Sequence, residues 1–242
     1  MRYKITLSYD GTEFCGWQSQ PCGTSVQDAV ERAACKLFCA EKIKAVGSGR
    51  TDAGVHALGQ VAHFDAPKSL PIKNVVGGLN AYLPQSVRVL DACEVGEAFD
   101  ARKSVKKKTY MYLLYGGVQQ PVLNNRVWFV SDLPSIEKLD AAVGAVAGEH
   151  DFATFMAAGG GAKTSVRTVY DAHFERHGEF TAFYITANGF LYNMVRIITA
   201  QAIKSARGDA DMRELLAARD RSQAKELAPA CGLYLYKVDY GE

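Results

Sequence analysis

The chain has 242 residues, 48% of them hydrophobic and 22% charged, which allows one large buried core or two smaller ones. Its formal net charge of +2 is too small to indicate a nucleic-acid partner by itself. The chain begins with a strand-like segment rather than a signal peptide, and no stretch approaches the roughly 20 apolar residues of a membrane span, so we expect a cytoplasmic protein without a membrane anchor.

Strand and helix patterns alternate in the first half of the chain. Thr24 and Gln27 form a capping box that opens a helix after the first strand. A second, shorter helix begins at Pro71, a residue that suits the first helical position. Alternating apolar residues predict four strands around these helices, over residues 3–9, 43–46, 60–65 and 87–95. The apolar faces of the two helices are Val26, Ala29, Val30, Ala33 and Leu37, and Val75, Leu79 and Leu83.

The second half repeats this order of elements. Alternating patterns predict strands over residues 105–115, 127–130, 166–177, 179–187 and 233–239. Helical spacing predicts helices over residues 135–147, 190–207 and 212–218. Gly178 joins the two long strands as a hairpin, and Gly148 and Gly208 end the two longer helices.

Both halves therefore follow a β-α-β-β-α-β order, which predicts an α+β protein of two ferredoxin-like halves. We expect the join near residue 100, with an N-terminal half over residues 1–103 and a C-terminal half over residues 104–242. Two antiparallel sheets side by side would leave an active-site cleft between the halves, a common place for ligands. A fold of this kind does not by itself define an activity.

The most informative segment lies between the second and third predicted strands. Residues 47–56 read Gly-Ser-Gly-Arg-Thr-Asp-Ala-Gly-Val-His, and the glycines permit tight turns and close approach of a ligand. Arg50 precedes Asp52 by two residues and favours its ionised form, which a nucleophile requires. The alternative is an ordinary turn, because Asp and Gly are common turn residues. The neighbouring Arg50 favours a catalytic loop built around Asp52.

A basic segment runs directly into an aromatic strand at the join between the halves. Cations contact RNA phosphates and aromatic rings stack on bases, so this combination is typical of RNA binding. A solvated linker followed by a half-buried strand explains it equally well. Tyr110 and Tyr112 share one strand face, so one of the rings can line the cleft. The whole segment comprises Arg102, Lys103, Lys106, Lys107 and Lys108, followed by Tyr110, Tyr112 and Tyr115.

Arg196 adjoins an apolar helix face that includes Met194 and Ile197. It is either a surface charge with a buried stem or the partner of a buried carboxylate in the site.

The histidines and cysteines show no metal-binding pattern. His56, His63 and Asp65 match no familiar ligand spacing with Asp52. Six cysteines, at positions 15, 22, 35, 39, 93 and 231, include no C-x-x-C pair. We therefore expect no metal site and reduced, partly buried thiols.

Residues 49–56, Gly-Arg-Thr-Asp-Ala-Gly-Val-His, resemble the signature loop of the tRNA pseudouridine synthase A family. Further segments resemble this family in the same order along the chain, at residues 9–11, 16–18, 59–61, 108–112, 148–152, 194–196 and 232–235. The resemblance implies a homodimeric enzyme, without a cofactor, that isomerises uridine to pseudouridine in tRNA. The implied targets are nucleotides 38, 39 and 40 of the anticodon stem-loop. The resemblance spans essentially all 242 residues of this chain.

By matching position, the resemblance implies Asp52 as the nucleophile and Tyr110 as the ring that stacks on the target base. It implies Arg50 and Arg196 as the cations around the carboxylate. An ionised carboxylate can attack the ribose or the base, or promote a glycal route, after the target base has left its stack. The loop over residues 157–163 is unusually glycine-rich, and we hypothesise that it influences which target nucleotide is modified.

Two other classes of protein remain open on the residues alone. A non-catalytic RNA-binding protein with two RRM-like halves combines the same fold with aromatic strands, although the sequence lacks the RNP1 string. A hydrolase with Asp52 as nucleophile or base would release a product, whereas an isomerase releases none.

Overall fold

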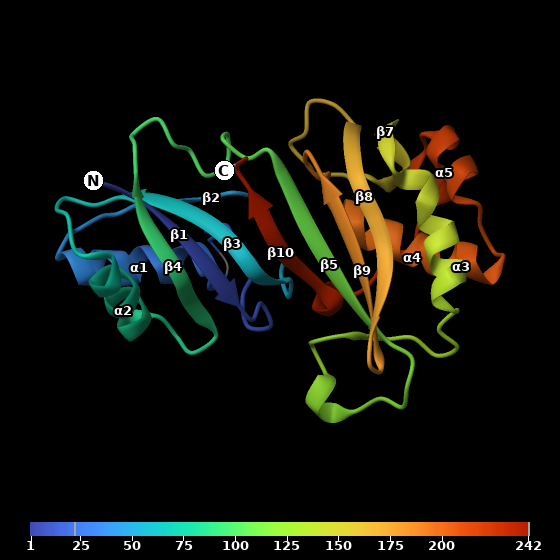
Figure 1. Ribbon diagram of the computed structural model, residues 1–242, viewed down its shortest axis with the longest axis horizontal. Helices are drawn as coiled ribbons and strands as arrows, with labels where there is room; N and C mark the ends of the chain where they lie inside the picture. The colour runs from blue at the N-terminus through green and yellow to red at the C-terminus, as the bar shows by residue number, and fades with distance from the viewer. Residues whose placement is uncertain (22, 242) are drawn as a thin grey trace. The chain divides into compact units, whose positions relative to one another are not determined.

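The computed structural model describes residues 1–21 and 23–241. The chain divides into two compact units, of which unit 1 comprises Met1–Lys106 and Tyr234–Glu242 and unit 2 comprises Lys107–Leu233. In Figure 1, unit 1 contains the elements from the blue β1 (Arg2–Tyr9) to the blue-green β4 (Val87–Val95), together with the red strand β10 (Leu233–Asp239). The sequence had assigned residues 104–242 to one half, whereas the last strand belongs to unit 1.

Pairing with a distant strand explains why β10 joins unit 1. Tyr234 and Leu235 of β10 pair in parallel with His56 and Ala57 of β3. Periodicity identified the strand itself, but the choice of partner depends on residues almost 180 positions away in the sequence. Local patterns therefore predict the element and not its neighbour.

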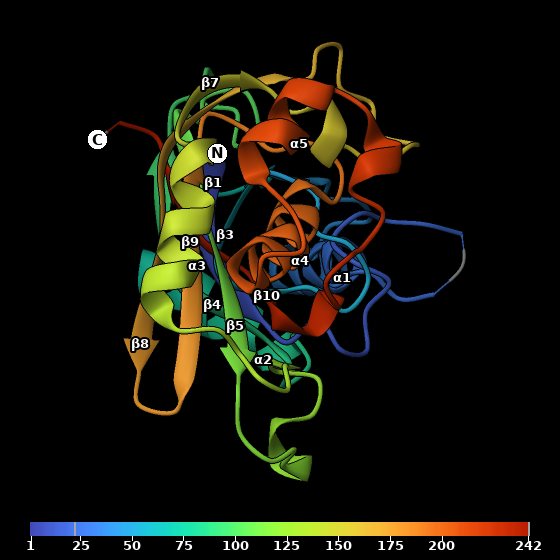
Figure 2. The ribbon, with the colours of Figure 1, turned by 90° about the vertical axis from the view of Figure 1, so that its right-hand side faces the viewer.

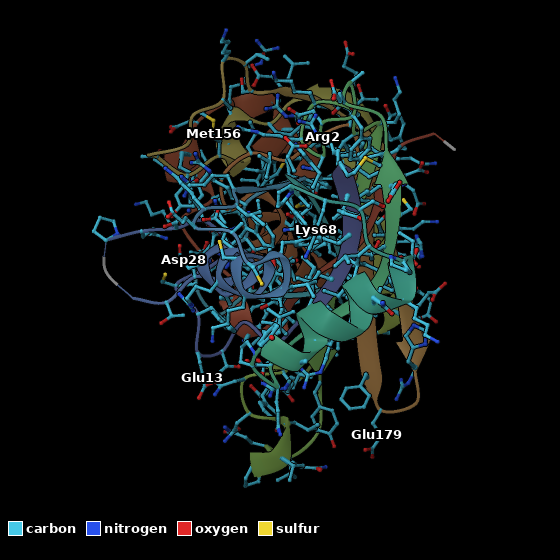
Figure 3. The ribbon with its side chains drawn as sticks, turned by 90° about the vertical axis from the view of Figure 1, so that its left-hand side faces the viewer. Arg2, Glu13, Asp28, Lys68, Met156 and Glu179 are labelled. Carbon is cyan, nitrogen blue, oxygen red and sulfur yellow. The ribbon has the colours of Figure 1, made fainter. Side chains whose placement is uncertain are left out.

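The sheet of unit 1 has the order β4-β1-β3-β10, with β2 paired to β3. β1 lies between β3 and β4 and is antiparallel to both, as in a split βαβ arrangement. Tyr3 of β1 is fully buried, and its ring lies 5.8 Å from that of Phe38 on α1. The helices α1 and α2 contact each other beside this sheet (Figure 3). The elements of unit 1 are β1 (Arg2–Tyr9), α1 (Val26–Phe38), β2 (Ala45–Gly47), β3 (His56–Asp65), α2 (Ile72–Tyr82), β4 (Val87–Val95) and β10 (Leu233–Asp239).

The first helix begins one residue later than the predicted capping box. Ser25 is the N-cap, and its hydroxyl accepts a hydrogen bond from the backbone N–H of Asp28 at 3.0 Å. The Ser25 hydroxyl also donates to the Asp28 carboxylate at 2.6 Å. Gln27, which was expected to close the box with Thr24, instead donates to the carbonyl oxygen of Ala45 at 3.2 Å. Ser25 rather than Thr24 therefore caps the helix, and Gln27 is hydrogen-bonded to Ala45 of β2 instead of closing the predicted box.

The sheet of unit 2 has the order β5-β9-β8-β7, with β6 parallel to β5. The strands β8 and β9 form the predicted hairpin, in which Gly178 has a φ of 61°. The helix α3 contacts α4 and β8, and α4 contacts α5 (Figure 2). The α+β class predicted from the sequence is confirmed. The elements of unit 2 are β5 (Lys107–Tyr115), β6 (Trp128–Phe129), α3 (Ile136–Val143), β7 (Gly148–Asp151), β8 (Val166–His177), β9 (Phe180–Ala187), α4 (Met194–Arg207) and α5 (Met212–Ala218).

Two helices of unit 2 are shorter than predicted. The helix α4 begins at Met194 rather than at residue 190, because Asn193 before it adopts a left-handed conformation with φ of 60°. The helix α3 ends at Val143, and a 3-10 turn over Gly144–Val146 follows it. The short strand β7, which no pattern predicted, pairs with β8. The two helix differences lie at helix ends, where the φ of a single residue can determine where the helix starts or stops.

The described cysteines fit the expected thiols. No disulfide joins any two of Cys15, Cys35, Cys39, Cys93 and Cys231, which are half-buried except for the exposed Cys39. Cys22 lies outside the described residues. Within residues 1–21 and 23–241, no helix combines the length and the apolar character needed to cross a membrane.

Candidate active site

Residues 48–55 connect β2 to β3 and carry Arg50 and Asp52. The backbone N–H of Val55 donates to the carbonyl oxygen of Asp52 at 3.1 Å, so Asp52 is the first residue of a β-turn. Gly54 stands third in this turn with φ of 76°, which glycine adopts without steric cost. Asp52 is half-buried and Arg50 is exposed. The loop therefore holds a partly accessible carboxylate on a hydrogen-bonded turn, two residues from a cation.

A hydroxyl–amide network made of Tyr9, Ser48, Thr51 and Gln60 lies beneath this loop, and all four side chains are buried. The hydroxyl of Ser48 donates to Oε1 of Gln60 at 2.7 Å. Nε2 of Gln60 donates to the carbonyl oxygen of Gly49 at 3.0 Å and to the Tyr9 hydroxyl at 3.4 Å. The hydroxyls of Tyr9 and Thr51 lie 2.8 Å apart. The network thus joins the first half of the loop, residues 48–51, to the strands β1 and β3.

Burial keeps the Tyr9 hydroxyl protonated. It raises the pKa of Tyr9 to about 12, although hydrogen bonds with Thr51 and Gln60 act in the opposite direction. A neutral phenol can donate one hydrogen bond and accept another. Tyr9 therefore serves as a permanent bridge between Gln60 and Thr51 at neutral pH.

A second loop, over residues 10–17, holds the Asp52 turn from the other side. The backbone N–H of Trp17 donates to the carbonyl oxygen of Thr51 at 3.1 Å. Gly16 has a φ of 103°, and a Cβ atom there would collide with this same oxygen. Glycine is therefore required at position 16 for both reasons. Figure 3 shows Glu13, from this loop, at the end of β1 opposite to Arg2.

His56, the first residue of β3, is buried at the base of the loop. Its Nδ1 accepts a hydrogen bond from the backbone N–H of Gly11 at 3.0 Å and lies 3.2 Å from Oδ1 of Asp10. Its ring stacks on Tyr234 with 4.7 Å between centroids. His56 therefore anchors the 10–17 loop and β10 to the start of β3.

Tyr110 lies in unit 2, on β5, opposite Ile185 of β9. It is 8% exposed, and its ring meets that of Phe190 edge to face at 4.9 Å. Tyr112 faces the same side but is fully buried, and its hydroxyl donates to the carbonyl oxygen of Pro229 at 2.7 Å. Both tyrosines on this face are therefore buried, Tyr112 completely and Tyr110 slightly less so.

Arg196 lies in the first turn of α4 and is half-buried. Its Nε donates to the carbonyl oxygen of Ala228 at 2.7 Å, and its Nη1 donates to the side chain of Asn193 at 3.0 Å. Two acceptors thus hold the guanidinium in one orientation, since its donors form a rigid planar fork.

The segment between β9 and α4, residues 188–193, contacts both Tyr110 and Arg196 within unit 2. Tyr110 contacts Phe190, and Arg196 contacts Asn193. Arg50 and Asp52 share the loop of unit 1. The sequence prediction had placed residues 190–193 in a helix and so missed this segment.

The network residues Tyr9 and Gln60 received no role from the sequence, although a signal for them exists. Gln60 alternates with Ala62 and Phe64, all of them buried, so it is a polar residue on an apolar strand face. A polar side chain at such a position requires hydrogen-bond partners. The pattern therefore indicated a buried network without identifying its members.

The basic segment predicted at the join is solvent-accessible, and Arg102, Lys103, Lys106 and Lys107 are exposed. Exposed cations of this kind suit contacts with an anionic partner. Across the part of the chain that the structure describes, no group of three or more histidine, cysteine or carboxylate side chains is arranged to hold a metal ion.

Comparison with known proteins identifies the family in which this fold and loop occur. The family model described as tRNA pseudouridine synthase matches residues 5–102 and 142–241, which include the Asp52 loop and the start of α4. The chain is 42% identical to tRNA pseudouridine synthase A of Latilactobacillus sakei, with 99% of this chain and 98% of the relative covered. It is 40% identical to tRNA pseudouridine synthase A 2 of Clostridium perfringens, with 98% of each chain covered.

A third relative, tRNA pseudouridine synthase A of Anoxybacillus flavithermus, is 40% identical, with 99% of this chain and 98% of the relative covered. Relatives at this identity over nearly the full length share the whole architecture and not only the loop. The chain therefore belongs to the tRNA pseudouridine synthase family.

Proposed function

We propose that this chain converts uridine to pseudouridine in tRNA and that Asp52 is the nucleophile. Membership of the family supports the reaction. The observation that supports Asp52 is the loop itself, because a half-buried carboxylate stands on a turn whose neighbours are fixed by buried hydrogen bonds. A carboxylate held in this way can meet a reacting atom with little loss of conformational freedom.

The reaction exchanges one bond for another and releases no fragment. The bond between C1′ of the ribose and N1 of uracil breaks, the ring turns, and a bond forms between C1′ and C5. The proton on C5 is lost to solvent and N1 gains a proton, so atoms and electrons balance. An ionised Asp52 can act on the ribose or on the base, and every route needs the carboxylate close to a base that has left its stack.

Three further residues are proposed to bind the substrate. Tyr110 is proposed as the ring that stacks on the target base, and its edge-to-face contact with Phe190 restrains the ring. Arg50 and Arg196 are proposed as cations that contact the anionic RNA, Arg50 from an exposed loop and Arg196 from the first turn of α4.

The proposed substrate is the anticodon stem-loop of tRNA, with nucleotides 38, 39 and 40 as targets. We propose that the enzyme acts as a homodimer in the cytoplasm. The exposed cations at 102–107 support contacts with the RNA backbone. Each phosphate contact releases counterions, so tRNA binding is expected to weaken steeply as salt is raised.

The test uses a tRNA transcript labelled with tritium at C5 of its uridines. The wild-type protein is expected to release tritium while the mass of the RNA changes only by the loss of label. Release of free uracil or of RNA fragments would indicate the hydrolase, and binding without tritium release would indicate the non-catalytic RNA-binding protein. Either result would refute the isomerase.

A further inference from the structure

We propose that the hydroxyl–amide network of Tyr9, Ser48, Thr51 and Gln60 positions the Asp52 carboxylate for reaction, and that these four are positioning residues. The inference rests on the proposed role of Asp52. None of the four is exposed by more than 6%, so they act through the loop and not by touching RNA. The network can hold the nucleophile in place because its polar side chains are buried and one of them belongs to Thr51, the residue before Asp52.

The orientation of the Gln60 amide follows from its partners. The carbonyl oxygen of Gly49 can only accept, so the atom 3.0 Å away from it must be Nε2. Oε1 then faces the hydroxyl of Ser48, which donates to it at 2.7 Å. Gln60 thereby fixes the two residues that lead from β2 into the loop, and no other orientation satisfies both.

The network continues from Gln60 through Tyr9 to Thr51. Nε2 of Gln60 donates to the Tyr9 oxygen at 3.4 Å, and the Tyr9 hydroxyl is hydrogen-bonded to the Thr51 hydroxyl 2.8 Å away. Tyr9 belongs to the core of unit 1, where it is 4% exposed and its ring lies 6.3 Å from that of Trp17. The hydrogen bond therefore connects a rigid core residue to the residue that precedes the nucleophile.

Thr51 is consequently held at two atoms. Its hydroxyl is bonded to Tyr9 and its carbonyl oxygen accepts from Trp17 at 3.1 Å. Asp52 follows it and is held in turn by its own carbonyl bond to Val55. Displacement of a catalytic group by about 1 Å costs on the order of 100-fold in rate. Loss of one anchor is thus expected to reduce turnover without removing any contact with tRNA.

The test compares kcat and KM for tritium release in four single variants. Tyr9→Phe and Thr51→Val each remove one hydroxyl and keep the shape, and each is expected to lower kcat by about 10- to 100-fold. KM for tRNA is expected to stay within about 3-fold of wild type, since only turnover depends on the position of Asp52. Thr51→Ser keeps the hydroxyl and is expected to retain most of kcat.

Tyr3→Phe is the matched control, because Tyr3 lies on the same face of the same strand and is fully buried. Its hydroxyl accepts from the backbone N–H of Leu70 at 2.8 Å, away from the loop. Tyr3→Phe is expected to lower thermal stability as Tyr9→Phe does, but to keep the wild-type kcat. Circular dichroism of each variant confirms that it is folded before its kinetics are compared.

The double variant Tyr9→Phe/Thr51→Val is expected to lose no more kcat than either single variant, since both remove the same hydrogen bond. Wild-type kcat in both single variants, or an equal loss in Tyr3→Phe, would overturn the positioning role while leaving the reaction itself established. Absence of tritium release by the wild type would instead overturn the proposed function, and the positioning role with it.

Discussion

Two loops of this chain are rich in glycine, yet they are built in opposite ways. The Asp52 loop, residues 48–55, is anchored by buried side chains and by the 10–17 loop. The loop at 157–163 is exposed from residue 158 onward. A Cβ atom on Gly47, where the Asp52 loop begins, would overlap the ring of Trp17. A Cβ atom on Gly159 or Gly161 would meet nothing within 4 Å.

Glycines therefore have different physical roles in and beside the two loops. Next to the first loop, Gly47 permits close packing against Trp17, and hydrogen bonds hold the backbone around Asp52. In the second loop, a Cβ atom at Gly159 or Gly161 would meet nothing, so the packing around these two residues is open. Glycine content alone therefore does not predict whether a loop is rigid.

The largest expected change in stability comes from adding a methyl group at Gly47, next to the first loop, and the matched control adds one at Gly161 in the second loop. Gly47→Ala places a Cβ atom against Trp17, which is only 3% exposed, and is expected to destabilise the protein by about 1 to 3 kcal/mol. Gly161→Ala, at a position with open space, is expected to change stability by less than about 0.5 kcal/mol. Chemical denaturation of both variants measures the two values. Equal values would remove the distinction between the loops.

Removal of a buried donor should have the next largest effect. Ser48→Ala leaves Oε1 of Gln60 without the hydroxyl that donates to it, and is expected to cost about 1 to 2 kcal/mol. The control is Thr164→Ala beside the second loop, where an exposed hydroxyl accepts from Val166. This control should stay within about 0.5 kcal/mol of wild type in the same denaturation experiment. A larger loss in the control than in Ser48→Ala would contradict the account.

The stability of the Asp52 loop is expected to depend on alkaline pH, because one of its anchors, Tyr9, is titratable. The pKa of Tyr9 is about 12 in the folded protein and 10.0 for an ordinary tyrosine. Its contribution to stability is therefore complete below pH 10 and is lost as the pH rises toward 12. Between pH 9 and 11, Tyr9→Phe is expected to lose about 1 kcal/mol less stability than wild type. Parallel curves would show that Tyr9 does not act as this anchor.

The sequence predicted elements well where the signal is local. The alternation in β4, β8 and β10 identified these strands with the residues at both ends, because side chains on alternate faces leave a period of two. The early start predicted for α4 was wrong, because the left-handed Asn193 interrupts an otherwise helical pattern. The short strand β7, with the sequence Gly-Glu-His-Asp, has no alternation and exists through its pairing with β8.

The residues of the candidate site also differ in whether their signal in the sequence is local. Asp52 and Arg50 were proposed from their neighbours in one loop, a purely local pattern. The network beneath them was not found, since Tyr9 and Gln60 are 51 positions apart and meet only in the folded sheet. Hydrogen-bond partners at this separation depend on strand register, which a single sequence does not specify.

The smallest expected change in stability comes from shortening the second loop. Deletion of residues 159–161 is expected to change the free energy of unfolding by less than about 0.5 kcal/mol, because all three residues are exposed and a Cβ atom at Gly159 or Gly161 would meet nothing within 4 Å. The distribution of pseudouridine among nucleotides 38, 39 and 40 is expected to change, if flexibility here guides the RNA. Mapping of modified positions measures it, and an unchanged distribution would refute this role for the loop.

The assignment of Asp52 as the nucleophile is tested by comparing tritium release from C5-labelled tRNA by wild type and by Asp52→Asn. The tRNA dissociation constant is measured for both proteins. Asp52→Asn keeps the shape of the side chain and removes its charge. We expect no release by the variant and a dissociation constant within about 3-fold of wild type, because every exposed cation remains in place. Release by Asp52→Asn at the wild-type rate would contradict the assignment of Asp52 as the nucleophile.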